Sequence, residues 1–264
     1  MAGDTSGAEG RPRLERGLQR FGTIVVVGGG CYGSYYLRQL RRAERAGALA
    51  WNRLIVVDRD SACAVAHTSV AESLPHFSLD VSSWADFFSR YLGAAAEEPD
   101  RHRADAVVPS PLMPHLMAGW LLERARVRWP RRDVHVAPLE SSPAVPWQRA
   151  SEDGTHYVSF AEWMCPINCI EPARCPHTRG ERTWSLPPAM VSYVNAERAA
   201  GRALGGPFVF HCAHRAFGVG MLDVADVLAA DRAIADGAEH HGGAFLVGTT
   251  SHCHGALQRL VIGA

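Results

Sequence analysis

The chain has 264 residues, 47% of them hydrophobic and 20% charged, which is enough to bury one large core or two small ones. Its 27 basic residues are balanced by 27 acidic residues, so we expect no nucleic-acid partner and no membrane partner. Every basic residue is arginine, which excludes chemistry that needs a lysine amine, such as Schiff-base catalysis and P-loop phosphate binding.

The N-terminal residues and the cysteines together predict a cellular compartment. Residues 1–21 are polar and arginine-rich, which predicts a flexible arm and lacks the apolar stretch of an export signal. The seven cysteines are odd in number, which argues against a disulfide framework. We therefore expect a cytoplasmic protein with reduced thiols that are available for metal binding or redox chemistry.

Residues 22–138 alternate short β-branched runs with longer amphipathic runs, the pattern of a parallel sheet covered by helices. The predicted strands are residues 23–27, 54–57, 106–108 and 134–137, with a weaker candidate at 76–79. The predicted helices are residues 34–45, 84–92 and 112–127. We therefore predict an α/β fold built on a Rossmann-like, doubly wound parallel sheet.

The pattern changes in residues 139–207, which are rich in Pro, Ser, Trp and Cys and have no sustained period. Irregular stretches of this length are uncommon in compact proteins, so we expect a Cys-rich metal-binding segment. Residues 208–264 are regular again, and predict a smaller C-terminal α/β part that either stands alone or continues the first sheet. Its predicted elements are strands at 208–212, 245–247 and 257–262 and a helix at 222–235.

A G-x-G-x-x-G turn, formed by Gly28, Gly30 and Gly33, lies between the first predicted strand and the first predicted helix. In this context the glycines allow a tight turn and close backbone approach, and the helix N-terminus attracts a pyrophosphate. Asp58 ends the next strand, where a carboxylate accepts both ribose hydroxyls, so the turn favours NAD over NADP. FAD, S-adenosylmethionine and a turn without ligand remain alternatives.

These residues resemble the N-terminal nucleotide-binding domain of the regulator-of-potassium-conductance (RCK) family, and the resemblance covers residues 22–138. It implies NAD(H) binding through Gly28, Gly30, Gly33 and Asp58. In that family nucleotide binding serves regulation instead of turnover, so the resemblance also implies a non-catalytic sensing role as an alternative to catalysis.

The most unusual passage contains Cys165, Cys169 and Cys175 in a C-x3-C-x5-C pattern. Three soft ligands this close in a reduced protein can bind one centre. Proline follows Cys165 and Cys175, as in ferredoxin loops, which favours an iron–sulfur cluster. Cys212, at the end of a later predicted strand that could converge with this loop, is the candidate for a fourth ligand or a nearby thiol. The alternatives are a structural zinc completed by an imidazole such as His177, and a reversible disulfide.

Two histidine clusters follow predicted strands, His211-Cys212-Ala213-His214 and His252-Cys253-His254. Carboxyl ends of strands are where open α/β sheets assemble ligand sites, so both clusters could converge with the cysteine loop. Imidazole carries protons near neutral pH, which makes His214 and His252 the candidate catalytic residues.

Together these patterns predict an NAD(H)-linked redox protein that couples a nucleotide to an iron–sulfur centre. Its partner would be a small-molecule substrate or an electron-transfer protein, and a homodimer is possible. The alternatives are a non-catalytic sensor of NAD or redox state and a Rossmann protein with a structural zinc.

Overall fold

The computed structural model describes residues 17–161 and 169–264. The strands in these ranges are β1 (Gln19–Val27), β2 (Leu49–Asp58), β3 (Phe77–Val81), β4 (Ala106–Val108), β5 (Val134–Ala137), β6 (Trp147–Ala150), β7 (His156–Ser159), β8 (Gly205–His211), β9 (Ala213–Ala216), β10 (Val219–Asp223), β11 (Gly243–Thr250) and β12 (His254–Ile262). The α-helices are α1 (Cys31–Arg45), α2 (Ser69–Glu72), α3 (Trp84–Glu97), α4 (Leu116–Arg128), α5 (Leu186–Ala199) and α6 (Val224–Ala238).

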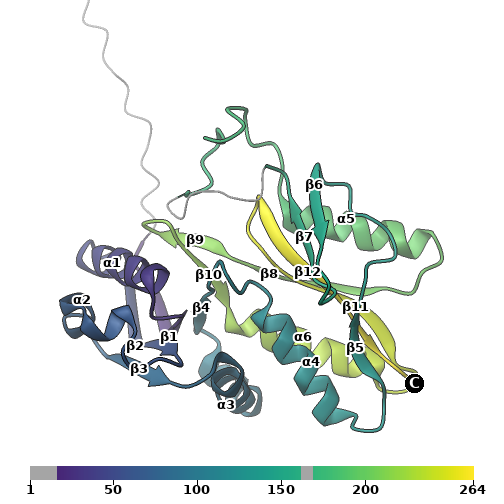
Figure 1. The fold of residues 1–264 in the computed structure, drawn as a ribbon, viewed down its shortest axis with the longest axis horizontal. Helices are drawn as coiled ribbons and strands as arrows, with labels where there is room; N and C mark the ends of the chain where they lie inside the picture. The colour runs from purple at the N-terminus through teal and green to yellow at the C-terminus, as the bar shows by residue number, and fades with distance from the viewer. Residues whose placement is uncertain (1–16, 162–168) are drawn as a thin grey trace, which may run out of the picture.

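Helices and strands interleave in a mixed α/β fold with two mixed sheets (Figure 1). In the first sheet the strand order is β3-β2-β1-β4-β10-β9. In the second sheet the order is β6-β7-β12-β11-β8, and β5 also pairs with β12. Both sheets therefore join strands that are far apart in the sequence.

Strands β1 to β4 of the first sheet pair in parallel, as the alternating pattern predicted. Their β-branched runs are continuous because both faces are buried: Val25 and Val27 face one core, and Ile24 and Val26 face another. The sheet is not parallel throughout, because β10 pairs antiparallel with β4. The predicted doubly wound parallel sheet is therefore correct for β1 to β4 and wrong at β10.

The predicted helix at 222–235 is wrong at its start, because its first two residues belong to strand β10. Leu222 and Asp223 pair with Val107 and Ala106 in the first sheet, and α6 begins only at Val224. The apolar residues of this stretch fit a buried strand as well as a helix, so the pattern alone could not separate the two.

Strands β5 and β8 belong to the second sheet, although the sequence analysis considered both for the first sheet. Strand β5 pairs antiparallel with the end of β12, and β8 pairs in parallel with β11. The chain then passes from β8 through Cys212 into β9, which pairs with β10 in the first sheet. The junction of β8 and β9 thus lies where the chain crosses from one sheet to the other (Figure 1).

Residues 139–207 contain more regular structure than the sequence predicted. Strand β7 pairs with β12 and β6 pairs with β7. Helix α5 buries Leu186, Met190 and Val194 in a core with Leu246 and Leu257 of the second sheet. Long-range pairing and packing, and not a local period, stabilise these elements.

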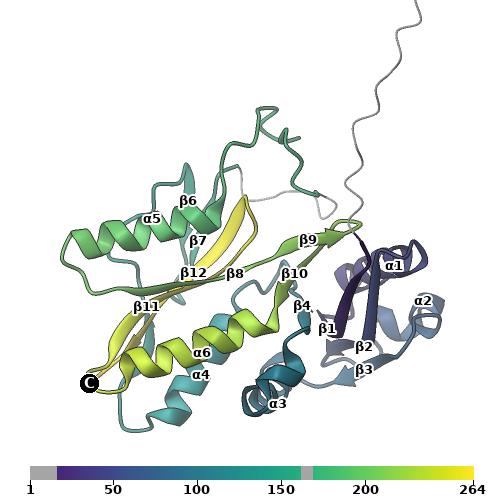
Figure 2. The same ribbon diagram turned by 180° about the vertical axis from the view of Figure 1, so that it is seen from behind.

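Helices α3, α4 and α6 lie between the two sheets, as Figure 2 shows from behind. Their buried side chains form one core with the inner faces of both sheets, including Val107 of the first and Phe245 of the second. Helix α1 covers the outer face of the first sheet, and α5 covers the outer face of the second. None of the helices within the described ranges has the length and apolar character that a membrane crossing requires.

Candidate functional site

The glycine turn joins β1 to α1 in a way that requires glycine. Gly28 has a φ of +87°, in the left-handed region that side chains disfavour. A Cβ on Gly33 would lie 2.0 Å from the carbonyl oxygen of Gly28, so only glycine lets α1 approach β1 this closely. Gly30 caps α1 without a side-chain hydrogen bond, and the first turn contains no acidic residue. No side chain of α1 itself therefore offsets the positive end of the helix dipole.

Asp58 lies beside the turn, as predicted, but its carboxylate also holds the turn closed. Its Oδ2 accepts a hydrogen bond from the backbone N–H of Gly29 at 2.6 Å, and its Oδ1 accepts one from Asp60 at 2.9 Å. Each carboxylate oxygen has a second lone pair, so both can still accept a ligand hydroxyl. Binding of a ribose by Asp58 stays a prediction.

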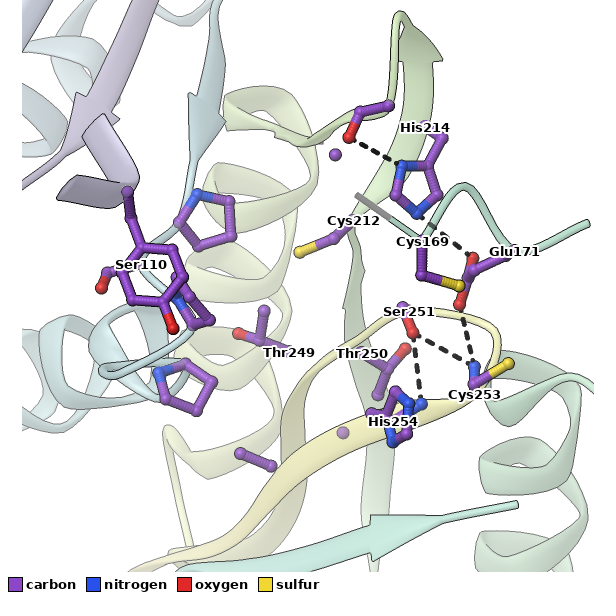
Figure 3. Close-up of a pocket in the computed structure, with 18 of the residues that line it drawn as sticks. Ser110, Cys169, Glu171, Cys212, His214, Thr249, Thr250, Ser251, Cys253 and His254 are labelled. Atoms are coloured by element: carbon purple, nitrogen blue, oxygen red, sulfur yellow. Dashed lines mark hydrogen bonds and ion pairs between the residues drawn. The ribbon is translucent and has the colours of Figure 1, made fainter. Parts of the chain in front are cut away.

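A cavity of about 290 Å³ lies between the two sheets, next to the crossing from β8 to β9 (Figure 3). One wall comes from the N-terminal part of the chain, namely Tyr32 and Tyr36 of α1 and the loop 109–114 after β4. The other wall comes from the loop 169–182, the β8–β9 junction and the turn from β11 to β12. Segments from both halves of the sequence therefore meet around one space.

Cysteines from three of these segments line the cavity: Cys169 and Cys175 from the loop, Cys212 from the junction and Cys253 from the turn. The sequence analysis named three of them as metal ligands and missed Cys253. Its position between His252 and His254 was the available signal. The remaining predicted ligand, Cys165, lies outside the described residues.

The four thiols have different electrostatic environments. Burial alone would raise the pKa of Cys175, but hydrogen bonds from Thr178 and the backbone of His177 hold it below the usual value. Burial raises the pKa of Cys212 to about 12 and that of Cys253 to about 11. Without a metal, Cys175 is therefore more disposed to ionise than Cys212 or Cys253.

The described thiols do not all point the same way. In Figure 3 the sulfur of Cys212 points toward the wall that contains Ser110, whereas the sulfur of Cys169 lies beside Glu171. Within residues 17–161 and 169–264, no group of three or more His, Cys, Asp or Glu side chains is arranged to hold a metal ion. The metal centre stays a prediction.

Glu171 is a site residue that the sequence analysis missed. Its side chain is 7% exposed, and its Oε2 lies 3.8 Å from Nε2 of His214. Its Oε1 accepts a hydrogen bond from the backbone N–H of Cys253 at 3.1 Å. Burial raises the pKa of this carboxyl, but a hydrogen bond from Ser251 and the charges of His214 and His252 outweigh burial and lower it. Glu171 is therefore an ionised carboxylate inside the cavity.

The two predicted catalytic histidines are placed differently. His214 lines the cavity, and its Nδ1 lies 3.2 Å from the carbonyl oxygen of Gly218. His252 is not among the described lining residues, and its Nδ1 lies 2.7 Å from Oγ of Ser185. Its ring packs edge-on against His211, with centroids 4.5 Å apart. His254 lines the cavity in its place.

A family model described as "Uncharacterized protein, C-terminal domain" (AF_1314_C) matches residues 117–263, which is more than half of the chain. The chain belongs to this family. The match begins within α4 and includes the whole second sheet, together with β9 and β10 of the first. All four described cavity cysteines lie within the AF_1314_C region, whereas Tyr32 and Tyr36 precede it. The comparisons with curated proteins and with solved structures found no match.

Proposed function

We propose that this protein is an NAD(H)-linked redox protein whose cavity holds a thiolate-bound metal centre, with an iron–sulfur cluster as the first candidate. The observation that carries the proposal is the meeting of two features at one cavity. Thiols of Cys169, Cys175 and Cys212 line one side, and Tyr32, in the first turn of α1 after the glycine turn, lines the other.

The nucleotide part of the proposal rests on β1 to β4 and α1, which would form a Rossmann-like unit. The parallel order β3-β2-β1-β4 and the glycine turn between β1 and α1 support this. The uncapped N-terminus of α1 would attract the pyrophosphate, and Asp58 would accept hydroxyls of the adenosine ribose. The loop 109–114 follows β4 and lines the cavity, so the other end of the dinucleotide would extend toward the thiols.

The donor set of the cavity fits a metal that prefers soft ligands. Thiolates suit both iron–sulfur clusters and zinc. The loop places Cys169 and Cys175 on the cavity, and the N–H of Thr178 donates to Cys175, which favours its thiolate form. Trp184 donates its indole N–H to the sulfur of Cys253 at 3.3 Å, a contact that would stabilise a ligand thiolate in the same way.

When bound, the nucleotide would supply hydride and the cluster would supply single-electron transfer. The protein would orient both groups, and its side chains would donate and accept protons. His214 lies on the cavity and in contact range of Glu171, so it is the better placed of the two predicted proton carriers. The electron partner would be a small molecule or a second protein.

Anaerobic purification followed by iron, sulfide and zinc analysis with a visible spectrum tests the metal centre. We expect a brown protein that oxidises NADH when an artificial electron acceptor is added. Cys175→Ser should lose metal, whereas Cys31→Ser should retain it, because Cys31 is exposed on α1. A colourless protein with one zinc would support the structural-zinc alternative, and a brown protein without NADH oxidation would support the sensor.

A further inference from the structure

Three buried polar atoms of residues that line the cavity have no hydrogen-bond partner within residues 17–161 and 169–264. They are Oε2 of Glu171 and Oγ1 of Thr249 and Thr250. Thr249 is 5% exposed and Thr250 is 1% exposed. Buried polar atoms in native proteins are nearly always hydrogen-bonded. Three such atoms around one space therefore offer hydrogen-bonding positions to a polar ligand.

Glu171 restricts the chemistry of that ligand. A carboxylate only accepts hydrogen bonds, so the group that satisfies Oε2 must donate an N–H or an O–H. Nε2 of His214, which forms an ion pair with Oε2, is 3.8 Å away, which is too far for a hydrogen bond. An anionic group at this place would be repelled by the carboxylate.

The opposite wall of the cavity restricts the rest of the ligand. It is formed by two tyrosine side chains and a proline-rich loop, namely Tyr32, Tyr36, Pro109, Pro111 and Pro114. In Figure 3 the hydroxyl of Thr249 and the thiol of Cys212 point toward the side of the cavity that contains Ser110, which belongs to the same proline-rich loop. Rings of this kind pack well against a flat apolar body, while the polar side receives a headgroup.

We propose that the cavity binds a flat organic molecule with a nitrogen headgroup, a carboxamide or an amidine. Its N–H donates to Oε2 of Glu171, a second hydrogen bond joins it to Thr249, and its ring packs against Tyr32 and Tyr36. Glu171 is then the residue that selects donors and rejects anions. This inference names the class of substrate that the proposed redox site would bind. It rests on the proposed redox function only for the reaction that follows binding, and not for binding itself.

Benzamide, benzamidine and benzoate have the same shape, so they test whether the cavity prefers hydrogen-bond donors to anions. Each probe is titrated into the anaerobically purified full chain, and binding is followed by ligand-observed NMR. We expect benzamide and benzamidine to bind and benzoate to bind at least about tenfold more weakly. Glu171→Gln should weaken benzamidine about tenfold and change benzamide by less than about threefold, because the amide keeps one acceptor but loses the charge. Glu181→Gln, at an exposed position in the same loop, is the matched control.

Thr249→Val keeps the shape of the side chain and removes the hydroxyl, so it should weaken benzamide and benzamidine about equally. It tests the proposal independently if Glu171→Gln fails to fold. Preferential binding of benzoate would overturn the proposal, and so would the absence of binding by all three probes, which would leave water as the occupant. Metal content and NADH oxidation of the same preparation report on the redox function separately from probe binding.

Discussion

The backbone N–H of Cys253 donates to Oε1 of Glu171 across 82 positions of sequence. This bond ties the cysteine loop to the turn between β11 and β12, so two segments of the same cavity wall are fixed relative to each other. It also orients the carboxylate, whose other oxygen then faces His214. Glu171 itself has a φ of +50°, a conformation that persists in non-glycine residues only when the surroundings hold it.

Gly33→Ala should destabilise the protein by about 1 to 3 kcal/mol, because the new methyl group would collide with the carbonyl oxygen of Gly28. Gly93→Ala is the matched control: Gly93 lies in α3 with open space around it, so alanine should stabilise the protein by about 0.5 to 1 kcal/mol. Urea denaturation measures both effects. Equal stability of Gly33→Ala and wild type would contradict the close approach of α1 to β1.

Asp105→Ala should cost about 3 kcal/mol of stability, because it leaves two half-buried donors without an acceptor. The carboxylate is 3% exposed and accepts hydrogen bonds from the backbone of Thr23 at 2.6 Å and from the hydroxyl of Tyr91 at 2.5 Å. Asp236→Ala, at an exposed position in α6, should change stability by less than about 0.5 kcal/mol. Chemical denaturation that shows similar losses for both variants would argue against this network.

Glu197 should make stability depend on acidic pH. Hydrogen bonds from Arg202, together with one from Ser141, hold the pKa of this buried carboxyl below its usual 4.5. The unfolded chain therefore binds the proton more readily, so the stabilisation is complete above about pH 4.5 and is lost as the pH falls through the folded-state pKa.

Urea midpoints measured from roughly pH 3 to 7 test this dependence. Glu197→Gln should be less stable than wild type at neutral pH and should lose less stability on acidification. Glu123→Gln, whose side chain is 64% exposed, should keep the wild-type slope. Parallel slopes for Glu197→Gln and wild type would show that other carboxylates cause the acid sensitivity.

Alkylation of the metal-free protein should distinguish Cys175 from Cys212 by its pH dependence. The pKa of Cys212 is raised to about 12 by burial and the nearby Glu171, so its reaction should accelerate about tenfold per pH unit above neutral. The reaction of Cys175, whose pKa is lowered, should depend less steeply on pH over the same range. Peptide mass spectrometry after iodoacetamide treatment gives both rates, and the Cys31→Ser variant removes the exposed thiol.

Bound metal should suppress this labelling. In the metal-loaded protein we expect Cys175 to resist iodoacetamide, and removal of metal by a chelator should restore its reactivity. Labelling of Cys175 at the same rate before and after chelation would argue against its role as a ligand.

Local patterns predicted the parts of the fold whose burial is visible in sequence. Strands β1, β2 and β4 are buried on both faces, so their apolar runs are continuous, and the predicted ranges 106–108 and 134–137 match β4 and β5. Strands β7 and β10 depend on the distant partners β12 and β4, and β6 in turn pairs with β7. Their short, mixed sequences carry no period that would reveal those partners.

The sequence predicted which cysteines belong to the candidate site, but not the buried polar residues around them. Thiol chemistry drew attention to Cys169, Cys175 and Cys212, which do line one cavity. Glu171 carried no comparable pattern, because its importance comes from burial and from a bond to a residue 82 positions away. Thr249 is likewise an ordinary strand residue until its hydroxyl is found buried without a partner in the described structure.

The pairing of β10 with β4 has a consequence for dissecting the molecule. The AF_1314_C region starts at residue 117 and contains β10, but β4 precedes it. Cutting the chain at that boundary would remove β4 and leave β10 paired only with β9, and the unpaired edge of β10 would promote aggregation. The unit marked by family membership and the unit that can stand alone are therefore different pieces of this polypeptide.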